Sequence, residues 1–338
     1  MLVPLKEVFE MKLGVNYLSE SMYIRKPPSK IEKDLKTMKN CGFEAIRLTG
    51  DKLSWLLQIA KLAKREGFEI WLCPRFANYL PMLSSIQYLT KIKEFAIAAE
   101  KENIDVFLIG NEVSLELRDF ADIQGYENRC GSNWPIFLQQ FREERRSKLF
   151  TSYLSFLAEG IRKYFSGKIS YAAGSWELNS IDWYYFDILG ANLYLWEQFP
   201  EKRYTETVQR LKSYGKPVAI TEFGFTTTQE AWSIGPRHIY GIRRMPSWIM
   251  NFLMSYPELL QKILRINPKI LLKSKIPHHY DEETQAALIS KNLKILDKCK
   301  VDYAFVFQWF EPWPAGFGVI RSNGTPKKAL KFLQNYNF

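Results

Sequence analysis

The sequence predicts an α/β fold, a (β/α)8 TIM barrel, and three observations support this. Short apolar runs typical of buried parallel strands alternate along the chain with longer helix-like segments. Eight such runs occur, the number of strands in a closed barrel of this type. The first run is followed by Ser19 and Glu20, whereas a doubly wound open sheet would normally carry a glycine-rich phosphate loop there.

The expected strands and helices follow one another in a regular order. Strands are predicted at residues 13–18, 45–50, 69–75, 106–111, 168–173, 188–194, 217–221 and 303–309. Helices are predicted at residues 31–40, 52–66, 84–102, 148–164, 203–214, 282–298 and 326–336. The connection at 174–187 is short, so any helix there is brief. We therefore expect one barrel domain over residues 1–338.

Two connections are too long to be simple links between a strand and a helix. Residues 114–147 follow the fourth predicted strand, and residues 226–281 follow the seventh. In a parallel barrel the segments that follow the strands lie over the active face. We expect long loops at these two places, with a basic, lid-like insertion at about 226–281.

The formal net charge of +11 is concentrated in that insertion. Residues 237–275 contain eight Lys and Arg against one acidic residue, Glu258. Three interpretations stay open: a lid with a solvated basic face, a peripheral contact with an anionic membrane or glycolipid, and recognition of an acidic sugar or nucleic acid. No nucleic-acid-binding motif accompanies the charge, so we expect no nucleic-acid partner.

Several other classes of protein do not fit the composition. No uncharged apolar run is long enough to span a membrane, and Lys6 and Glu7 stand where a secretion signal would be apolar. The four cysteines show no CxxC pairing, which is typical of reduced thiols, and we expect a cytoplasmic protein. His278 and His279 have no third ligand at a useful spacing, so we expect no metal, and no organic cofactor is expected either.

Two glutamates stand at the ends of predicted strands. Glu112 closes the run Val-Phe-Leu-Ile-Gly-Asn-Glu, and Glu222 closes the run Pro-Val-Ala-Ile-Thr-Glu. Residues just past the strand ends lie at the active face of a parallel barrel, where the fourth and seventh strands face each other across the mouth. Two carboxyl groups brought together there have the chemistry of glycoside hydrolysis, one as acid and one as nucleophile.

These motifs resemble those of clan A of the glycoside hydrolases, a group of retaining (β/α)8 enzymes. The pair Asn-Glu at 111–112 and the segment Ile-Thr-Glu-Phe-Gly at 220–224 carry the resemblance, which covers roughly residues 13–335. It implies that Glu112 is the general acid/base, that Glu222 is the nucleophile, and that Asn111 binds the sugar 2-hydroxyl. Val113 replaces the proline that many members have after the acid, so the chain resembles a divergent branch and its substrate does not follow.

Three further positions match the pattern of the clan. Arg47, on the second predicted strand, would keep Glu222 ionised through its fixed positive charge. Tyr194 would donate a hydrogen bond to the nucleophile. Trp309, at the end of the last predicted strand, would form an aromatic platform under the sugar.

Asn16 and Tyr17 end the first predicted strand and are expected to line the pocket. Together with the resemblance, these residues predict a retaining glycoside hydrolase that cleaves a β-type bond in a carbohydrate substrate by double displacement. Two alternatives stay open, namely a transglycosylase with the same residues and a non-catalytic barrel that binds carbohydrate or membrane. A binding protein has no need to hold two carboxylates together.

Overall fold

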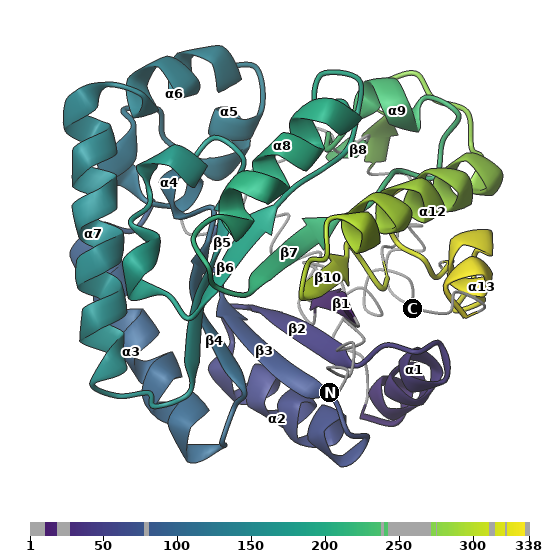
Figure 1. Cartoon of the computed structure of the whole chain (residues 1–338), viewed down its shortest axis with the longest axis horizontal. Helices are drawn as coiled ribbons and strands as arrows, with labels where there is room; N and C mark the ends of the chain where they lie inside the picture. The colour runs from purple at the N-terminus through teal and green to yellow at the C-terminus, as the bar shows by residue number, and fades with distance from the viewer. Residues whose placement is uncertain are drawn as a thin grey trace, which may run out of the picture.

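The computed structural model describes residues 11–18, 28–77, 81–237, 240–242, 272–274, 276–310, 315–321 and 323–334. Its barrel strands are β1 (Lys12–Leu18), β2 (Ala45–Gly50), β3 (Glu69–Pro74), β4 (Val106–Asn111), β5 (Lys168–Gly174), β6 (Ile188–Asn192), β7 (Val218–Phe223) and β10 (Tyr303–Val306). They pair in parallel in the closed order β1, β10, β7, β6, β5, β4, β3, β2 (Figure 1). The predicted (β/α)8 barrel is thereby confirmed.

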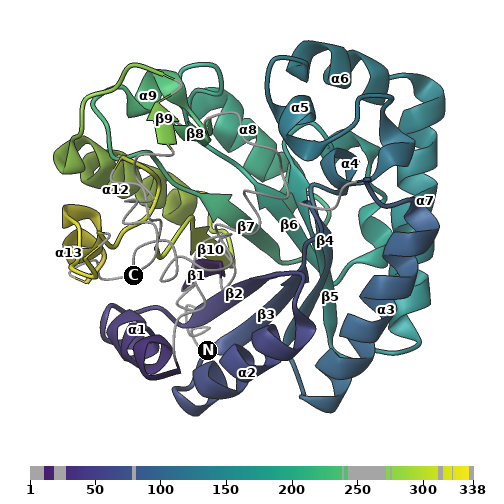
Figure 2. The same cartoon turned by 180° about the vertical axis from the view of Figure 1, so that it is seen from behind.

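Helices surround this barrel (Figures 1 and 2). They are α1 (Pro28–Asn40), α2 (Leu53–Arg65), α3 (Ser85–Lys101), α7 (Glu144–Arg162), α8 (Glu201–Lys212), α12 (Glu282–Lys298) and α13 (Lys328–Gln334). Between β5 and β6 the chain forms two brief 3-10 turns, η2 (Leu178–Ser180) and η3 (Trp183–Tyr185). The last helix begins later than predicted, because Pro326 pairs with Ile320 in an isolated β-bridge.

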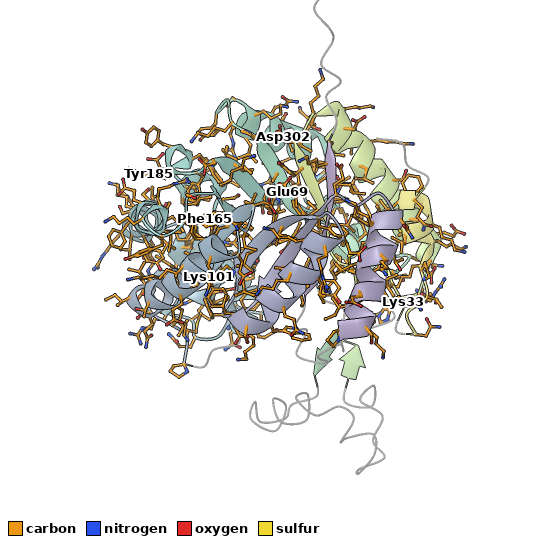
Figure 3. All side chains as sticks on the ribbon, turned by 90° about the horizontal axis from the view of Figure 1, so that it is seen from below. Lys33, Glu69, Lys101, Phe165, Tyr185 and Asp302 are labelled. Atoms are coloured by element: carbon orange, nitrogen blue, oxygen red, sulfur yellow. The ribbon has the colours of Figure 1, made fainter. Side chains whose placement is uncertain are left out.

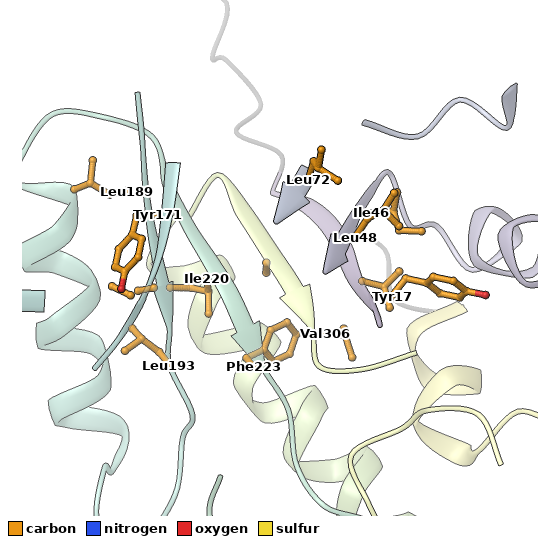
Figure 4. Close-up of a cluster of buried hydrophobic side chains, with 14 of the residues drawn as sticks. Tyr17, Ile46, Leu48, Leu72, Tyr171, Leu189, Leu193, Ile220, Phe223 and Val306 are labelled. Carbon is orange, nitrogen blue, oxygen red and sulfur yellow. The ribbon is translucent and has the colours of Figure 1, made fainter. Parts of the chain in front are cut away.

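Alternating strand residues build two apolar layers. Outward side chains such as Ile46, Leu48 and Ile220 belong to the layer between the barrel and its helices (Figure 4). Inward side chains fill the barrel, where the ring centroids of Trp71 and Phe305 lie 4.8 Å apart. The interior is therefore a solid core, and functional groups are confined to the ends of the strands.

Polar contacts tie the strands together at their amino-terminal ends, the region of Glu69 and Asp302 in Figure 3. Lys12 Nζ lies 2.8 Å from Glu69 Oε2, and the Trp71 indole donates a 3.0 Å hydrogen bond to Glu69 Oε1. Asp302 Oδ2 accepts a 2.8 Å hydrogen bond from the Val218 backbone N–H. The first contact joins β1 to β3, the second lies within β3, and the third joins β7 to the residue before β10. All three lie at the face that contributes to stability in parallel barrels.

The two longest connections differ in structure. After β4 the chain forms α4 (Val113–Glu116), η1 (Arg118–Phe120), α5 (Tyr126–Cys130) and α6 (Trp134–Phe141). After β7 it forms α9 (Ala231–Ile234) and the antiparallel pair β8 (Tyr240–Ile242) and β9 (Leu272–Ser274), which stands clear of the barrel in Figure 3. Most of the basic segment 237–275, including its predicted membrane or glycolipid contact, lies outside the described residues. Within the described ranges no helix has the length and apolar character needed to cross a bilayer.

Arg129 organises the connection after β4. Its buried guanidinium donates hydrogen bonds of 2.6–2.7 Å to the backbone carbonyls of Ser114, Leu117, Ala121 and Ile123. Burial lowers the pKa of Arg129 to about 10. One side chain thus satisfies carbonyls at the end of α4 and in the following loop, which would otherwise be buried without donors.

Replacement of Arg129 by Met keeps the apolar stem of the side chain but removes every donor to these carbonyls. We expect R129M to lower the free energy of unfolding by more than about 3 kcal/mol, measured by urea denaturation. R118M is the matched control, because Arg118 is exposed in the same connection, and a change below about 0.5 kcal/mol is expected. Equal stability of R129M and the unmodified protein would show that these contacts do not hold the loop.

Candidate active site

Glu112 lies in a tight turn at the end of β4. Its backbone is left-handed, with φ 47°, and its N–H donates a 2.9 Å hydrogen bond to the Ala172 carbonyl on β5. The chain then enters α4 directly, so the carboxyl group stays at the mouth of the barrel. Glu112 Oε1 accepts a 3.0 Å hydrogen bond from Asn192 Nδ2, and within the described residues it forms no ion pair.

Glu222 lies on β7 and is held by two strong donors. Arg47 Nη1 on β2 lies 2.8 Å from Glu222 Oε1, and the Tyr194 hydroxyl donates a 2.8 Å hydrogen bond to Glu222 Oε2. The side chain is 13% exposed, which leaves it an open side at the mouth. Both carboxylate oxygens are therefore oriented, and the negative charge is compensated by a cation.

Arg47 is the hub of the polar network at the strand ends. Its side chain is 0% exposed, and it donates to Asn16 Oδ1 at 2.9 Å and to Asn111 Oδ1 at 2.6 Å as well as to Glu222. Asn16 in turn donates a 2.9 Å hydrogen bond to the Thr221 carbonyl, one residue before Glu222. Asn16 was predicted to line the pocket, but it is only 1% exposed. It positions Arg47 instead.

Asn111 and Asn192 connect the two glutamates. Asn192 Nδ2 donates to Asn111 Oδ1 and to Glu112 Oε1, each at 3.0 Å. Because Asn111 Oδ1 already accepts from Arg47 and Asn192, its amide is oriented with Nδ2 free to act as a donor. A continuous chain of hydrogen bonds therefore runs from Glu222 through Arg47, Asn111 and Asn192 to Glu112.

The two carboxyl groups differ in their electrostatic surroundings. Burial and, next, the nearby negative charge of Glu222 raise the pKa of Glu112 to about 8, against the Asn192 hydrogen bond, which lowers this pKa. Burial lowers the pKa of Arg47, but the neighbouring Cys73 and Glu222 outweigh this effect, so the pKa of Arg47 is raised. Glu112 is thus a protonated acid at neutral pH, beside a carboxylate that is paired with a cation.

Two residues predicted to contact the sugar lie elsewhere. The Tyr17 hydroxyl donates a 3.0 Å hydrogen bond to Asp34 on α1, and Figure 4 shows its ring pointing away from the barrel strands. Trp309 is 1% exposed and packs in the outer layer, with its ring centroid 6.3 Å from that of Phe43. Neither ring offers a face to a ligand at the mouth, so both predictions are wrong. Phe307 is partly exposed and lies beside the site, with its ring centroid 6.3 Å from that of Tyr194.

Two charged residues of the mouth were missed by the sequence analysis. Arg75 follows β3, and its Nε lies 3.2 Å from Glu116 Oε1 on α4. Burial raises the pKa of Glu116 to about 7. Only their positions in the sequence could have indicated that they lie at the site. Arg75 is the last residue of a predicted strand, and Glu116 lies one helical turn after Glu112.

The predicted absence of a metal concerns His278 and His279. His279 Nδ1 lies 2.5 Å from Glu230 Oε1 in an exposed pair. In the part of the chain that the structure describes, no cluster of three or more His, Cys, Asp or Glu side chains is placed to bind a metal ion.

Comparison with known proteins identifies the fold. No model of a known protein family matches the chain, and no curated protein matches it either. Among solved structures, a GH113 β-1,4-mannanase superposes with a TM-score of 0.61 at 13% identity, covering 97% of this chain and 99% of that one. The GH113 β-mannanase from Alicyclobacillus acidocaldarius gives a TM-score of 0.59 at 10% identity, covering 98% and 97%.

A larger enzyme contains the same barrel. Bacteroides uniformis β-glucuronidase 2 superposes with a TM-score of 0.58 at 12% identity, over 96% of this chain but 35% of that one. At such identities the likeness establishes the (β/α)8 fold of these glycoside hydrolases, and the chemistry rests on the residues at the mouth.

The raised pKa of Glu112 makes stability depend on pH. The ordinary glutamate value is 4.5 and the folded value is about 8, so between these values the folded state holds a proton that the unfolded chain releases. The free energy of unfolding should therefore fall as pH rises from about 4.5 to about 8. We expect E112Q to make this fall shallower, as measured by urea denaturation at pH 5 and pH 8.

The control is E206Q, because Glu206 is exposed on α8 and makes no contact with the site. E206Q should retain the pH dependence of the unmodified protein. If E112Q and E206Q had the same slope, Glu112 would not hold a proton in the folded state at neutral pH.

Proposed function

We propose that this protein is a retaining glycoside hydrolase that cleaves a β-type glycosidic bond. The observation that carries the proposal is the contrast between two glutamates joined by one hydrogen-bond network. Glu112 is half-buried and holds its proton at neutral pH, whereas Glu222 is paired with Arg47 and Tyr194. Retaining glycosidases need this division of labour between an acid and a nucleophile.

In the first step a bond forms to Glu222 and the glycosidic bond breaks. A Glu222 oxygen attacks the anomeric carbon, while Glu112 gives its proton to the glycosidic oxygen of the departing group. The products are a covalent glycosyl ester on Glu222 and a neutral alcohol. Arg47 and Tyr194 hold Glu222 in place for this attack.

In the second step water cleaves the ester. Glu112, now a carboxylate, removes a proton from water as the water oxygen bonds to the anomeric carbon and Glu222 leaves. Both glutamates return to their starting states, and the sugar keeps its original anomeric configuration. The free Nδ2 of Asn111 is placed to donate to a hydroxyl of the bound sugar.

Carbohydrate is the substrate class that the neighbours in fold suggest. Their names specify a β-1,4-mannanase and β-glucuronidases, which act on β-linked sugars. Transglycosylation would use the same glutamates, with a sugar hydroxyl in place of water in the second step. Product analysis with added acceptor sugars separates the two outcomes.

The glycosyl ester should be directly trappable. We expect an activated 2-deoxy-2-fluoro glycoside from a panel of β-mannosides, β-glucosides, β-glucuronides and β-galacturonides to add one sugar to the protein, as measured by intact mass and mapped by peptide mass spectrometry to Glu222. E222Q, which keeps the size of the side chain, should acquire no label. Complete hydrolysis of the parent glycoside by E222Q would contradict the proposal.

The acid role of Glu112 predicts a pH profile. We expect kcat/KM for the glycoside that labels Glu222 to fall above about pH 8, as Glu112 loses its proton. E112A should lose this alkaline limb. An unchanged limb in E112A would assign the titration to another group.

A further inference from the structure

The turn that presents Glu112 is held by a buried pair that does not touch the candidate catalytic centre. The backbone N–H of Val113 donates a 2.8 Å hydrogen bond to the Tyr171 hydroxyl, and the N–H of Ser114 donates a 3.0 Å hydrogen bond to Glu177 Oε1. These are the two residues that follow Glu112 in the chain. Their anchors come from β5 and from the loop after it.

Tyr171 and Glu177 also bind each other. The Tyr171 hydroxyl donates a 2.9 Å hydrogen bond to Glu177 Oε2, which accepts another 2.9 Å hydrogen bond from the Gly174 N–H. Both side chains are 0% exposed. All of these distances are those of well-formed hydrogen bonds, so the pair is a buried anchor whose polar groups bond to the turn and to each other.

The turn needs such an anchor because its backbone is unfavourable. A non-glycine residue with φ 47° is uncommon and adopts this state when its surroundings impose it. The turn is also tightly packed at Gly110, two residues before Glu112. A Cβ added at Gly110 would lie 2.3 Å from Val113 Cγ2 and 2.5 Å from the Tyr88 hydroxyl. The direction of the Glu112 side chain therefore depends on where Val113 and Ser114 are held.

Charge adds a second link between the pair and Glu112. Burial raises the pKa of Glu177 to about 7, and its negative charge in turn raises the pKa of Glu112. Glu222 acts on Glu112 in the same direction, whereas Arg75 acts in the opposite direction. The negative charge of Glu177 also raises the pKa of Glu116.

We propose that Tyr171 and Glu177 are positioning residues that hold the Glu112 carboxyl in line with the departing oxygen and favour its protonated form. The inference rests on the proposed function, because it assigns Glu112 the role of acid. Neither residue touches the reacting atoms. Their effect is exerted through the backbone of Val113 and Ser114 and through the charge of Glu177.

The test is the dependence of the rate on the leaving group. A dinitrophenyl glycoside departs without a proton, whereas an unactivated disaccharide or alkyl glycoside requires the acid. We expect Y171F to lower kcat/KM roughly tenfold or more for the unactivated substrate and less than about threefold for the dinitrophenyl glycoside. Y153F is the matched control, because the Tyr153 hydroxyl also bonds to the backbone, donating a 3.0 Å hydrogen bond to the Ser85 carbonyl far from Glu112 in the chain.

Y153F should leave the ratio of the two rates unchanged. Equal losses on both substrates in Y171F would show a merely structural role and overturn the inference. The proposed function itself would fail if the unmodified protein hydrolysed neither substrate and formed no Glu222 adduct. That result differs from a Y171F variant that loses activity equally on both substrates, which overturns only the inference.

E177Q provides an independent measurement. It keeps the shape of the side chain but removes the charge that raises the pKa of Glu112, so the alkaline limb of kcat/KM should move to lower pH. Thermal unfolding checks that E177Q is folded. If the alkaline limb of kcat/KM stays at the same pH in folded E177Q, the electrostatic part of the inference is contradicted.

Discussion

The ion pair between Arg47 and Glu222 is the interaction on which the mouth of the barrel depends. Arg47 has no exposed surface, so its charge must be compensated where it lies. Glu222 supplies the negative charge, and the amide oxygens of Asn16 and Asn111 satisfy further donors. These partners come from β1, β4 and β7. The site can therefore form only when the barrel is closed, because no two neighbouring strands contain all of the contacts.

The same network gives two chemically identical side chains different roles. Glu222 is paired with a cation and a tyrosine hydroxyl, whereas the half-buried Glu112 carboxyl accepts one hydrogen bond from a neutral amide. A charge that is already present at Glu222 makes a second charge at Glu112 costly. The protonated state of Glu112 thus depends partly on the charge of Glu222, and Asn111 and Asn192 connect the two groups.

The strands were predictable because their signal is local. The boundaries of β2 and β4 were predicted at the residues where the structure places them, since apolar runs end at turn residues there. Asn16 and Tyr17 could not both line the pocket, because successive strand residues face opposite sides. Trp309 was predicted to lie under the sugar because the last strand was expected to continue to residue 309. β10 instead ends at Val306, and the Trp309 ring packs in the outer layer.

By itself, the sequence determined the (β/α)8 fold, the strand ends that carry Glu112 and Glu222, and the arginine on the second strand. Hydrophobic periodicity and position along a strand are properties of neighbouring residues, so no contact had to be known. Only the tertiary structure decided which glutamate is paired with a cation and which keeps its proton. The contacts of Asn192 and Glu177 with the turn at Glu112 join residues far apart in the chain, and burial arises only when the barrel closes around them.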